Sequence, residues 1–461
     1  MIRGSLTDLA RILEATLVGP DPGFAGVSTD TRRLTARELF VALRGPNFDG
    51  HDFVPGAAAR GAAGAVVERP VDAALPWLRV EDSLQALGAI AADWRRRFIL
   101  PVLAVTGSFG KTTVKEMMAA IAAARGEVLA TRGNLNNEIG LPLTLLRLGA
   151  SHRAAVLELG ANHAGEIERL AAICRPSVGV VTAAGPVHLE GFGSLEGVAR
   201  AKGELFAGLP DDATAVINAD DPFAPLWREL AGARSRVHFG LASEAEFRAE
   251  ALRQSLDPAG PVLEFRLVTP DGTAEVRLGL PGRHNALNAL AAAAATWAAG
   301  WSLDEIVDGL ARVRGVAGRM SLRKARSGAL LIDDSYNANP TALLAAVEYA
   351  TALPGETWVV LGDMGELGTA SAELHAEAGE LARTRGVARL YTIGTESAAA
   401  ARAYGTPRHF DSLDALAAEL EAELPAEVNL LVKGSRSMRL EKLVERLVEP
   451  PAEPGTAGEG R

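Results

Sequence analysis

The sequence predicts an α/β protein of three domains: a small N-terminal α/β domain (residues 1–98), a central parallel-sheet domain with a P-loop (99–316) and a C-terminal Rossmann-like domain (317–450). Three observations lead to this fold class. Two separate series alternate apolar segments of strand length with amphipathic stretches of helix length, a pattern typical of parallel sheets covered by helices. A glycine-rich turn follows the first strand of the earlier series. At 461 residues, the chain also exceeds what one hydrophobic core usually holds.

The first 98 residues mix short apolar runs, at 38–43 and 64–67, with helix-like stretches, the mixture expected of a small α/β domain. Pro101 begins the second pattern, with strand candidates at 102–106, 154–159, 178–182 and 215–217 and an amphipathic helix at 112–125 that Gly126 ends. Alternation around Pro270-Asp271-Gly272 predicts a hairpin over 264–278, and an alanine-rich helix follows at 285–299.

A second alternating series begins near residue 318. Its strand candidates are 329–333, 357–361, 389–393 and 429–432, with helices between them, which predicts a second doubly wound unit. The segment 451–461 is rich in proline, glycine and glutamate, and we expect a disordered tail there.

Composition narrows the class of protein. Hydrophobic residues make up 48% and charged residues 23% of a chain with net charge −10, which is typical of soluble globular proteins and argues against a nucleic-acid partner. No run of about 18 uncharged apolar residues occurs, so we expect no membrane span. Residues 1–17 do not form a secretion signal. The one cysteine, Cys174, can form no internal disulfide and is interpreted as a small core residue, so we expect a cytoplasmic protein.

A phosphate cradle is predicted between the strand at 102–106 and the helix that follows it. Glycines let backbone N–H groups turn inward, the helix N-terminus adds partial positive charge, Lys111 can neutralise β- and γ-phosphates, and Thr112 can ligate Mg²⁺. The loop is a shortened variant of the Walker pattern, because Val105 stands where that pattern has its first glycine. The expected nucleotide-binding residues here are Gly107, Ser108, Gly110, Lys111, Thr112 and Thr113. An ordinary strand–helix turn is the alternative, and kinases, ATPases and ligases all use such loops.

Further motifs, spread through the chain in a fixed order, narrow the choice among these classes of enzyme. Besides Gly-x-x-Gly-Lys-Thr at 107–112, they are NLNNEIGLP (134–142), ELGAN (158–162), HLEGFGS (188–194), AKGE (201–204), LPGRHN (280–285), GR (318–319), DDSYNANP (333–340), GDM (362–364) and LVKGSR (431–436). Together they resemble the Mur ligase family over residues 25–440.

The resemblance implies an ATP-dependent amide-bond ligase. Members of the family use the γ-phosphate of ATP to convert a substrate carboxylate into an acyl phosphate, which an incoming amine attacks. DDSYNANP, GFGSL, AKGE and LVKGSR are similar to the motifs of the member that joins D-alanyl-D-alanine to UDP-N-acetylmuramoyl-tripeptide, so these are the expected partners of a monomeric enzyme. We expect ATP and two Mg²⁺ ions to serve the reaction, since the site must neutralise charge on phosphate and on the tetrahedral intermediate.

Four residues are expected to carry the catalysis. By the resemblance, Lys111 binds the phosphates, Thr112 and Glu158 bind one Mg²⁺, and His188 and Lys202 bind the second, Lys202 as a carbamate formed with CO₂. Arginine supplies most of the positive charge of this chain and cannot form such a carbamate, which makes the lysine at 202 more significant. The alternatives are a solvated strand-end carboxylate, a structural histidine and a helix-surface lysine.

Further binding residues are implied in all three domains. For the nucleotide, Asn285 and Asn288 resemble contacts to adenine, Arg319 the linker arginine that reaches the phosphates, and Asp334 the ribose contact. For the substrates, the implied residues are Ser28, Thr29, Asp30, Arg32, Asp49 and His51 at the UDP-sugar, Asn134, Asn136 and Asn137 at the phosphate or muramoyl side, and Lys433, Ser435 and Arg436 at a carboxylate. The alternatives are a helix cap for Asn285, a solvated linker for Arg319 and ordinary polar turns for the N-terminal group.

One residue departs from the family. Ala183 stands where an asparagine usually follows the strand threonine, so the polar geometry beside the metal is in doubt. Three rival functions stay open. The long segment before Pro101 argues against a folylpolyglutamate-type ligase, and DDSYNANP argues against a Mur ligase that adds a single amino acid. The presence of Lys111, Glu158, His188 and Lys202 argues against a non-catalytic relic.

Overall fold

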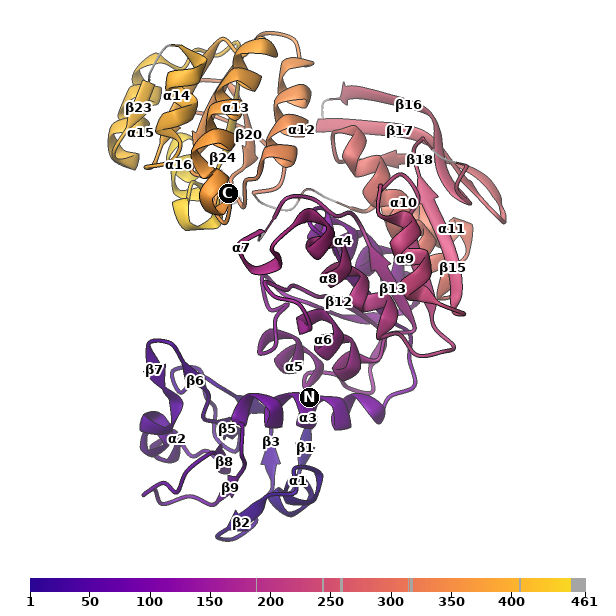
Figure 1. The fold of residues 1–461 in the computed structure, drawn as a ribbon, viewed down its shortest axis with the longest axis vertical. Coiled ribbons are helices and arrows are strands. Elements are labelled where there is room, and N and C mark those ends of the chain that lie inside the picture. Colours follow the sequence, from indigo (N-terminus) through magenta and orange to yellow (C-terminus); the bar gives the residue numbers. More distant parts are fainter. Residues whose placement is uncertain are drawn as a thin grey trace, which may run out of the picture.

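The computed structural model describes residues 1–187, 189–242, 244–257, 260–313, 315, 318–405 and 408–448. The chain forms three α/β domains with mainly parallel sheets, which confirms the predicted fold class. The domains follow one another around an arc, from the N-terminal domain in indigo at the bottom to the C-terminal domain in orange and yellow at the top (Figure 1). The tail predicted at 451–461 lies outside the described residues.

The N-terminal domain is built on a sheet with strand order β2-β9-β8-β5-β4, beside the short pairs β1–β3 and β6–β7. The apolar run at 64–67 is strand β8, and the run at 38–43 contains β5. The elements are β1 (Arg3–Gly4), α1 (Leu6–Ile12), β2 (Thr16–Val18), β3 (Phe24–Ala25), β4 (Val27–Ser28), β5 (Leu39–Val41), β6 (Arg44–Gly45), β7 (Phe48–Asp49), η1 (Gly50–Phe53), α2 (Val54–Ala59), β8 (Gly64–Val67), β9 (Trp77–Arg79) and α3 (Ser83–Arg96).

Helix α3 joins this domain to the next. Its N-cap residue, Asp82, accepts hydrogen bonds from two backbone N–H groups of the first turn, which starts the helix. Its apolar side, with Leu87 and Ile90, is buried in one core that continues from the N-terminal sheet to one face of the middle sheet. Near its end, the buried guanidinium of Arg95 donates to the carbonyl of Cys174 at 3.1 Å. The first two domains therefore pack as one unit, and Cys174 is the small core residue that we expected.

The middle domain has a long sheet with strand order β11-β12-β10-β13-β14-β15-β16-β17-β18. The strands run parallel from β11 to β16, and β16, β17 and β18 pair antiparallel, as the predicted hairpin requires. The elements are β10 (Val102–Thr106), α4 (Lys111–Ala122), η2 (Ala123–Arg125), β11 (Glu127–Ala130), α5 (Gly140–Leu145), β12 (His152–Glu158), α6 (Glu166–Cys174), β13 (Val178–Val181), α7 (Leu189–Phe192), α8 (Leu195–Ala207), β14 (Thr214–Asn218), α9 (Ala224–Ala231), β15 (Ser235–Gly240), β16 (Phe247–Asp257), β17 (Gly260–Thr269), β18 (Gly272–Leu278), α10 (Arg283–Ala298) and α11 (Leu303–Ala311).

The alanine-rich helix α10 is the centre of the second core of this domain. Its residues from Ala289 to Ala295 are almost completely buried against α4 and the sheet. Small side chains let helix and sheet backbones approach closely, which explains why so many alanines fill one buried helix. The N-terminus of α10 is thereby fixed close to the phosphate loop.

The C-terminal domain is the predicted second doubly wound unit. Its sheet has strand order β19-β20-β24-β21-β22-β23, in which only β19 is antiparallel to its neighbour among the described strands. The elements are β19 (Ser321–Lys324), β20 (Leu330–Asp334), α12 (Pro340–Thr351), β21 (Glu356–Gly362), η3 (Gly368–Ala370), α13 (Ser371–Thr384), β22 (Arg389–Ile393), α14 (Ala398–Tyr404), β23 (Arg408–Phe410), α15 (Leu413–Glu423), β24 (Val428–Lys433), η4 (Arg436–Met438) and α16 (Glu441–Leu447).

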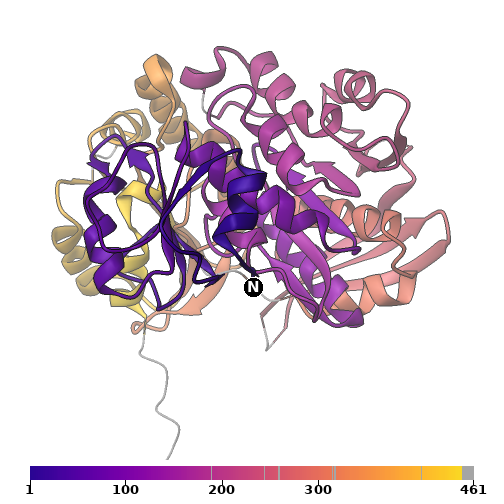
Figure 2. The ribbon, with the colours of Figure 1, turned by 90° about the horizontal axis from the view of Figure 1, so that it is seen from below.

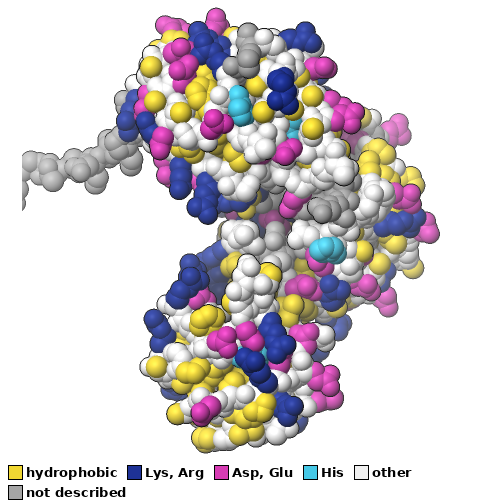
Figure 3. Space-filling view, turned by 60° about the vertical axis from the view of Figure 1, so that its left-hand side comes forward, with side chains coloured by type: hydrophobic (Ala, Val, Ile, Leu, Met, Phe, Trp, Pro, Cys, Tyr) yellow, Lys and Arg dark blue, Asp and Glu magenta, His cyan; other side chains and the backbone are white. Residues whose placement is uncertain are grey.

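The arc leaves the N-terminal and C-terminal domains on the same side of the middle domain (Figure 2). A hollow separates these two outer domains in the space-filling view, and Lys and Arg side chains lie along its rim (Figure 3). Within the described residues, no helix combines the length and the apolar character that crossing a bilayer requires.

Candidate functional site

The predicted phosphate loop connects β10 to α4 with two glycines in left-handed or extended positive-φ conformations. Gly110 is the N-cap of α4 with φ 76°, and Gly107 has φ 143°. A Cβ at 107 would collide with the hydroxyl of Thr182, and a Cβ at 110 with the amide of Asn288. Glycine is therefore required at both positions by conformation and by space. The first backbone N–H groups of α4 open into the cavity as a cradle for an anion.

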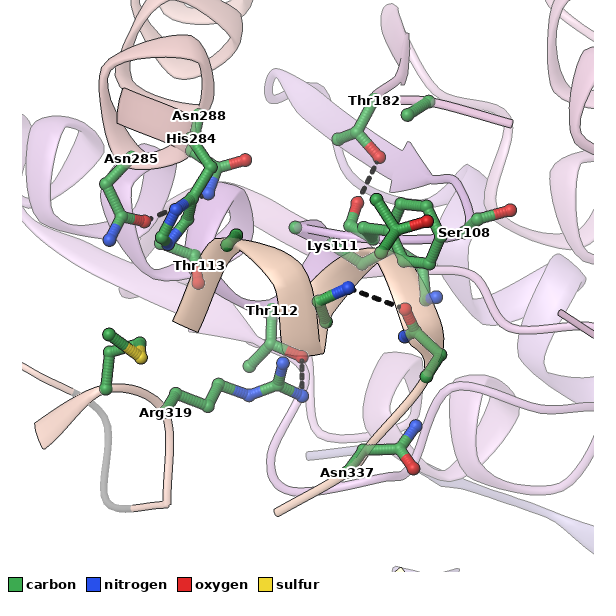
Figure 4. A pocket seen from close by; sticks show the side chains of 18 of the residues that line it. Ser108, Lys111, Thr112, Thr113, Thr182, His284, Asn285, Asn288, Arg319 and Asn337 are labelled. Carbon is green, nitrogen blue, oxygen red and sulfur yellow. Dashed lines mark hydrogen bonds between the residues drawn. The ribbon is translucent and has the colours of Figure 1, made fainter. Parts of the chain in front are cut away.

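Lys111 and Thr112, the first residues of α4, point into this cradle (Figure 4). The ammonium of Lys111 donates to the carbonyl of Gly107 at 2.6 Å, and its enclosure lowers its pKa, an effect that the carboxylate of Glu158 opposes. The hydroxyl of Thr112 donates to Glu158 Oε2 at 2.8 Å. A cation, a hydroxyl and a carboxylate thus meet at the start of one helix.

Glu158 lies at the carboxyl end of β12, where it is held from two sides. Its second carboxylate oxygen, Oε1, accepts a hydrogen bond from Asn136 Nδ2 at 2.8 Å, and its backbone N–H donates to the hydroxyl of Thr131. The side chain is almost fully buried. Asn136 is thus brought to the centre of the site. Asn137 instead caps α5, because its side-chain oxygen accepts from the N–H of Gly140 at 2.9 Å.

The loop after β13 forms the opposite wall of the cradle. The N–H of Ser108 donates to the carbonyl of Ala183 at 2.8 Å, and the hydroxyl of Ser108 accepts from the N–H of Gly185 at 2.9 Å. Asp221, buried after β14, accepts from the N–H of Ala184 at 2.9 Å, and burial raises its pKa. The backbone thus holds this loop where Ala183 offers no polar side chain. The next predicted residue, His188, lies outside the described residues.

Lys202 is buried inside α8, with a side chain only about 1% exposed. Its Nζ lies 3.4 Å from the carbonyl O of Ala161 and 5.0 Å from the centre of the Phe192 ring. Burial, assisted by the positive charge of Lys111, lowers the pKa of Lys202 to about 7. No ion pair joins Lys202 to a carboxylate within the described part of the chain. Lys202 is therefore not a helix-surface lysine.

A cavity of about 510 Å³ lies between the phosphate loop and the C-terminal domain. Polar residues of the middle domain line one side of it, and residues of the DDSYNANP segment and β24 line the other. Its apolar lining residues are Leu280, Leu287, Val313, Met320, Ala342 and Ala346. A cavity of this volume, lined by cationic, polar and apolar groups, has the chemistry for a nucleoside phosphate.

Arg319, from the segment before β19, reaches across to the middle domain. Its Nη2 donates to Thr112 Oγ1 at 2.9 Å (Figure 4). Asp334, at the end of β20, accepts from the N–H of Met320 at 3.1 Å and pairs with Lys433 Nζ at 2.5 Å. Lys433 therefore pairs with Asp334 at the wall of this cavity, and its contact with a substrate carboxylate stays a prediction.

Asn285 and Asn288 occupy the first turns of α10. Asn285 is buried, donates to the carbonyl of Pro281 at 2.5 Å and accepts from Asn288 Nδ2 at 3.0 Å (Figure 4). Asn285 therefore orients Asn288, and the carbonyl oxygen of Asn288 faces Gly110. Asn285 is therefore not the helix cap considered above, because Gly282 is the N-cap residue of α10 and the Asn285 side chain instead holds a second residue of the cavity.

The N-terminal candidates form two separate loops outside this cavity. Asp30 binds the guanidinium of Arg32, with a shortest contact of 2.8 Å, and this hydrogen-bonded pairing lowers the pKa of Asp30 to about 2. The hydroxyl of Ser28 donates to the carbonyl of Asp30, which leaves Thr29 between them. Asp49 accepts from the backbone and ring N–H of His51.

Both ring nitrogens of His51 are used inside the protein, because Nε2 accepts from the N–H of Glu68 at 2.8 Å. His51 is almost fully buried and therefore orders the loop that presents Asp49. At the C-terminal side, Ser435 is buried beside Ser437 and Arg436 is exposed and bonds Glu441. Asn134 lies exposed at the start of the loop that carries Asn136.

Sequence reasoning missed several residues that shape the site. Thr182, Asn218 and Asp221 hold the wall opposite the phosphate loop, since Asn218 Nδ2 donates to the carbonyl of Thr182 at 2.7 Å. These three residues follow parallel strands at their carboxyl ends, and that placement is the signal that could have identified them. Tyr336, inside the DDSYNANP motif, lies beside Arg319 and was given no role.

Comparisons with known proteins agree along the whole chain. Residues 24–95 match the Mur ligase family catalytic domain, residues 105–296 the Mur ligase middle domain, and residues 318–436 the Mur ligase glutamate ligase domain. The chain is 44% identical to the UDP-N-acetylmuramoyl-tripeptide–D-alanyl-D-alanine ligase of Escherichia coli over 97% of this chain and 99% of that protein.

Solved structures show the same likeness. A crystal structure of MurF from Acinetobacter baumannii superimposes with a TM-score of 0.91 at 35% identity, covering 97% of this chain and 99% of that one. The MurF ligase of Thermotoga maritima, solved in complex with ADP, superimposes with a TM-score of 0.82 at 29% identity, covering 92% and 96%.

Proposed function

The chain belongs to the Mur ligase family, and we infer that it is the ATP-dependent ligase that joins D-alanyl-D-alanine to UDP-N-acetylmuramoyl-tripeptide, giving the UDP-linked pentapeptide precursor of peptidoglycan. The observation that carries this function is the convergence of Lys111, Thr112 and Glu158, the first two of which line the cavity of about 510 Å³, in a chain that matches such ligases over almost its full length. The likeness argues against a folylpolyglutamate-type function and against a relic.

ATP fills the cavity between the middle and C-terminal domains. Its phosphates lie on the N-terminus of α4, where Lys111 and the backbone N–H groups of the loop neutralise them. The apolar lining residues of the cavity pack against the adenine, with Asn288 as a polar contact, and Asp334 faces the ribose. Support for nucleotide binding comes from the related MurF ligase of Thermotoga maritima, which was solved in complex with ADP.

Magnesium suits the donors at the phosphate end. The hydroxyl of Thr112 and the carboxylate of Glu158 are hard oxygen donors 2.8 Å apart. Among the described residues, no three His, Cys, Asp or Glu side chains cluster to hold a cation, so Thr112 and Glu158 are the residues that would hold Mg²⁺ here, together with oxygens of the bound nucleotide. Bound Mg²⁺ supplies charge neutralisation at the transferring phosphoryl group. A second ion would be held by His188 and by Lys202 as its carbamate, which the burial of the Lys202 amine supports.

The reaction needs activation, because a carboxylate and an amine do not condense in water. Transfer of the γ-phosphoryl group to the tripeptide carboxylate gives an acyl phosphate, and attack by the dipeptide amine then releases phosphate. Lys111 and Arg319 stabilise the charge on the transferring group from opposite domains. We assign 1–98 to the UDP-substrate, 99–316 to ATP and 317–450 to closure over both, with the loops at Asp30–Arg32 and Asp49 facing the UDP-sugar.

Phosphate release tests this function. The purified chain is supplied with ATP and Mg²⁺, and inorganic phosphate is measured with UDP-tripeptide alone, with dipeptide alone and with both. We expect release only with both, together with a product whose mass equals the tripeptide plus the dipeptide minus water. Phosphate release that ignores the dipeptide, or no mass change of the UDP-substrate, would overturn the function.

A further inference from the structure

The guanidinium of Arg319 is buried with incomplete hydrogen bonding. Its Nη2 donates to Thr112 Oγ1 at 2.9 Å, whereas its Nε is buried and has no hydrogen-bond partner among the described residues. A buried donor without a partner is unfavourable, and such groups in native proteins call for an explanation. In this cavity, the unpaired Nε is available to an incoming acceptor such as a phosphate oxygen.

The guanidinium of Arg319 packs against the aromatic ring of Tyr336. The central carbon of the guanidinium lies 4.3 Å from the centre of that ring, a distance at which the negative face of the ring attracts the cation. No hydrogen bond to the Tyr336 hydroxyl is found within the described part of the chain. The ring, and not its hydroxyl, therefore makes the contact with Arg319.

The backbone fixes the two residues relative to each other. The N–H of Tyr336 donates to the carbonyl of Gly318 at 3.0 Å. Gly318 has φ +75°, and a Cβ there would lie 3.2 Å from the Cβ of Tyr336. Glycine is thus needed for both conformation and space, and it lets Tyr336 pack directly behind Arg319. The N–H of Gly318 also donates to Asp333 Oδ2 at 3.1 Å, which ties the segment to β20.

A second guanidinium approaches the same ring. The central carbon of Arg436 lies 5.5 Å from the ring centre of Tyr336. Two like charges near one another repel, and a shared aromatic ring offsets that repulsion by attracting both. The ring therefore lies near both the arginine that touches the phosphate loop and Arg436, which follows β24 in the LVKGSR motif.

We propose that Tyr336 is a positioning residue whose ring holds the Arg319 guanidinium so that Nε and Nη2 face the phosphates of the bound nucleotide. Tyr336 acts through Arg319 and does not touch the reacting atoms. The proposal rests on the proposed function only in that ATP occupies the cavity. It predicts that the ring matters for binding the β- and γ-phosphates and matters little for binding adenosine monophosphate.

Calorimetric binding to the full chain with Mg²⁺ tests this, using β,γ-methylene-ATP and AMP as probes. Tyr336→Leu should weaken β,γ-methylene-ATP about 5- to 30-fold, the loss of one desolvated cation–π contact, and change AMP by less than about twofold. Tyr336→Phe should recover most of the lost affinity. Tyr404→Leu, which removes a tyrosine from the same domain outside the cavity, should leave the ratio of the two affinities at the wild-type value.

A double-mutant cycle separates positioning from a general loosening of the pocket. Because Tyr336 acts through the Arg319 cation, Arg319→Gln combined with Tyr336→Leu should bind β,γ-methylene-ATP no more than about twofold more weakly than Arg319→Gln alone. Simple addition of the two losses, equal weakening of both probes, or no recovery by phenylalanine would overturn the proposal. If Tyr336→Leu shows no cooperative melting transition, Tyr336→Met replaces it, since a flexible thioether fills the space without a ring.

The ligation assay separates a failure of the proposed function from a failure of the proposed role of Tyr336. A wild-type chain that does not join the dipeptide to the UDP-tripeptide would overturn the proposed function. A wild-type chain that does so, with Tyr336→Leu binding both probes normally, would overturn only the role of Tyr336.

Discussion

The amine of Lys202 should react with dissolved CO₂ at neutral pH, and its advantage over an ordinary lysine can be calculated. Burial and the nearby charge of Lys111 lower the pKa of Lys202 from 10.5 to about 7. At pH 7 about half of the Lys202 amines are therefore uncharged, against roughly 1 in 3000 for a lysine of ordinary pKa, an enrichment on the order of a thousandfold in the form that attacks CO₂. Because the pKa is lowered, the reactive form is lost as the pH falls below 7, and above pH 7 it can rise by no more than about twofold.

Carbon NMR with ¹³C-labelled bicarbonate measures this directly. We expect one carbamate resonance in the wild-type chain that weakens from pH 8 to pH 6 at constant dissolved CO₂. Lys202→Arg, which keeps the positive charge, should lack the resonance. Lys324→Ala, which removes an exposed lysine on β19, should keep it.

The phosphate-release activity of a Lys202 variant tests the carbamate independently of NMR. Lys202→Ala should lose phosphate release and regain part of it with added acetate, because a short carboxylate can replace the carbamate oxygens. A wild-type chain without a resonance at any pH, or Lys202→Arg with the resonance intact, would refute the inference that burial makes the Lys202 amine reactive toward CO₂.

Three further predictions follow from the described contacts. Lys111→Ala should lower kcat for phosphate release at least about 100-fold with an unchanged circular dichroism spectrum, and near-normal turnover would contradict its place in the phosphate cradle. Asp221→Ala should lower the free energy of unfolding in urea by about 1–3 kcal/mol, since the N–H groups of Ala184 and Phe223 lose their buried acceptor; an unchanged urea midpoint would show that water replaces it. Burial raises the pKa of Cys174 to about 12, so iodoacetamide at pH 8 should modify the chain only after denaturation, and rapid labelling of the native chain would be inconsistent with that burial.

The buried strands were predictable from the sequence because each is a short apolar run bounded by polar or glycine residues. The runs at 64–67, 102–106 and 389–393 are strands β8, β10 and β22 with the same bounds. Strands β11, β15 and β19 were not predicted. Each carries polar side chains, and β11 and β19 are edge strands; backbone hydrogen bonds to a neighbouring strand define them, and no continuous apolar run marks such a strand.

The site residues likewise fall into two groups: those that a short local motif predicts, and those whose contacts come from distant parts of the chain. The phosphate loop is one short continuous segment, so its glycines, Lys111 and Thr112 could be predicted from their spacing alone. The partners that orient these groups come from distant segments: Asn136 to Glu158, Asp221 to the loop after β13, and Tyr336 to Arg319. The partner of Lys433 could not be predicted from its motif, because its pairing with Asp334 depends on two parallel strands that lie side by side in the sheet.

The distribution of hydrophobic cores explains why the nucleotide has to complete the site. One core runs from the N-terminal sheet through α3 into the middle sheet, so separating these domains would expose apolar surface. Among the described residues, the two cores of the C-terminal sheet share no member with those of the middle domain. The hydrogen bond from Arg319 to Thr112 crosses between them, and one such bond is worth little in net free energy. A nucleotide that contacts Lys111 on one side and Asp334 on the other would touch both domains, so we expect its binding energy, rather than a shared core, to hold the C-terminal domain in the catalytic position.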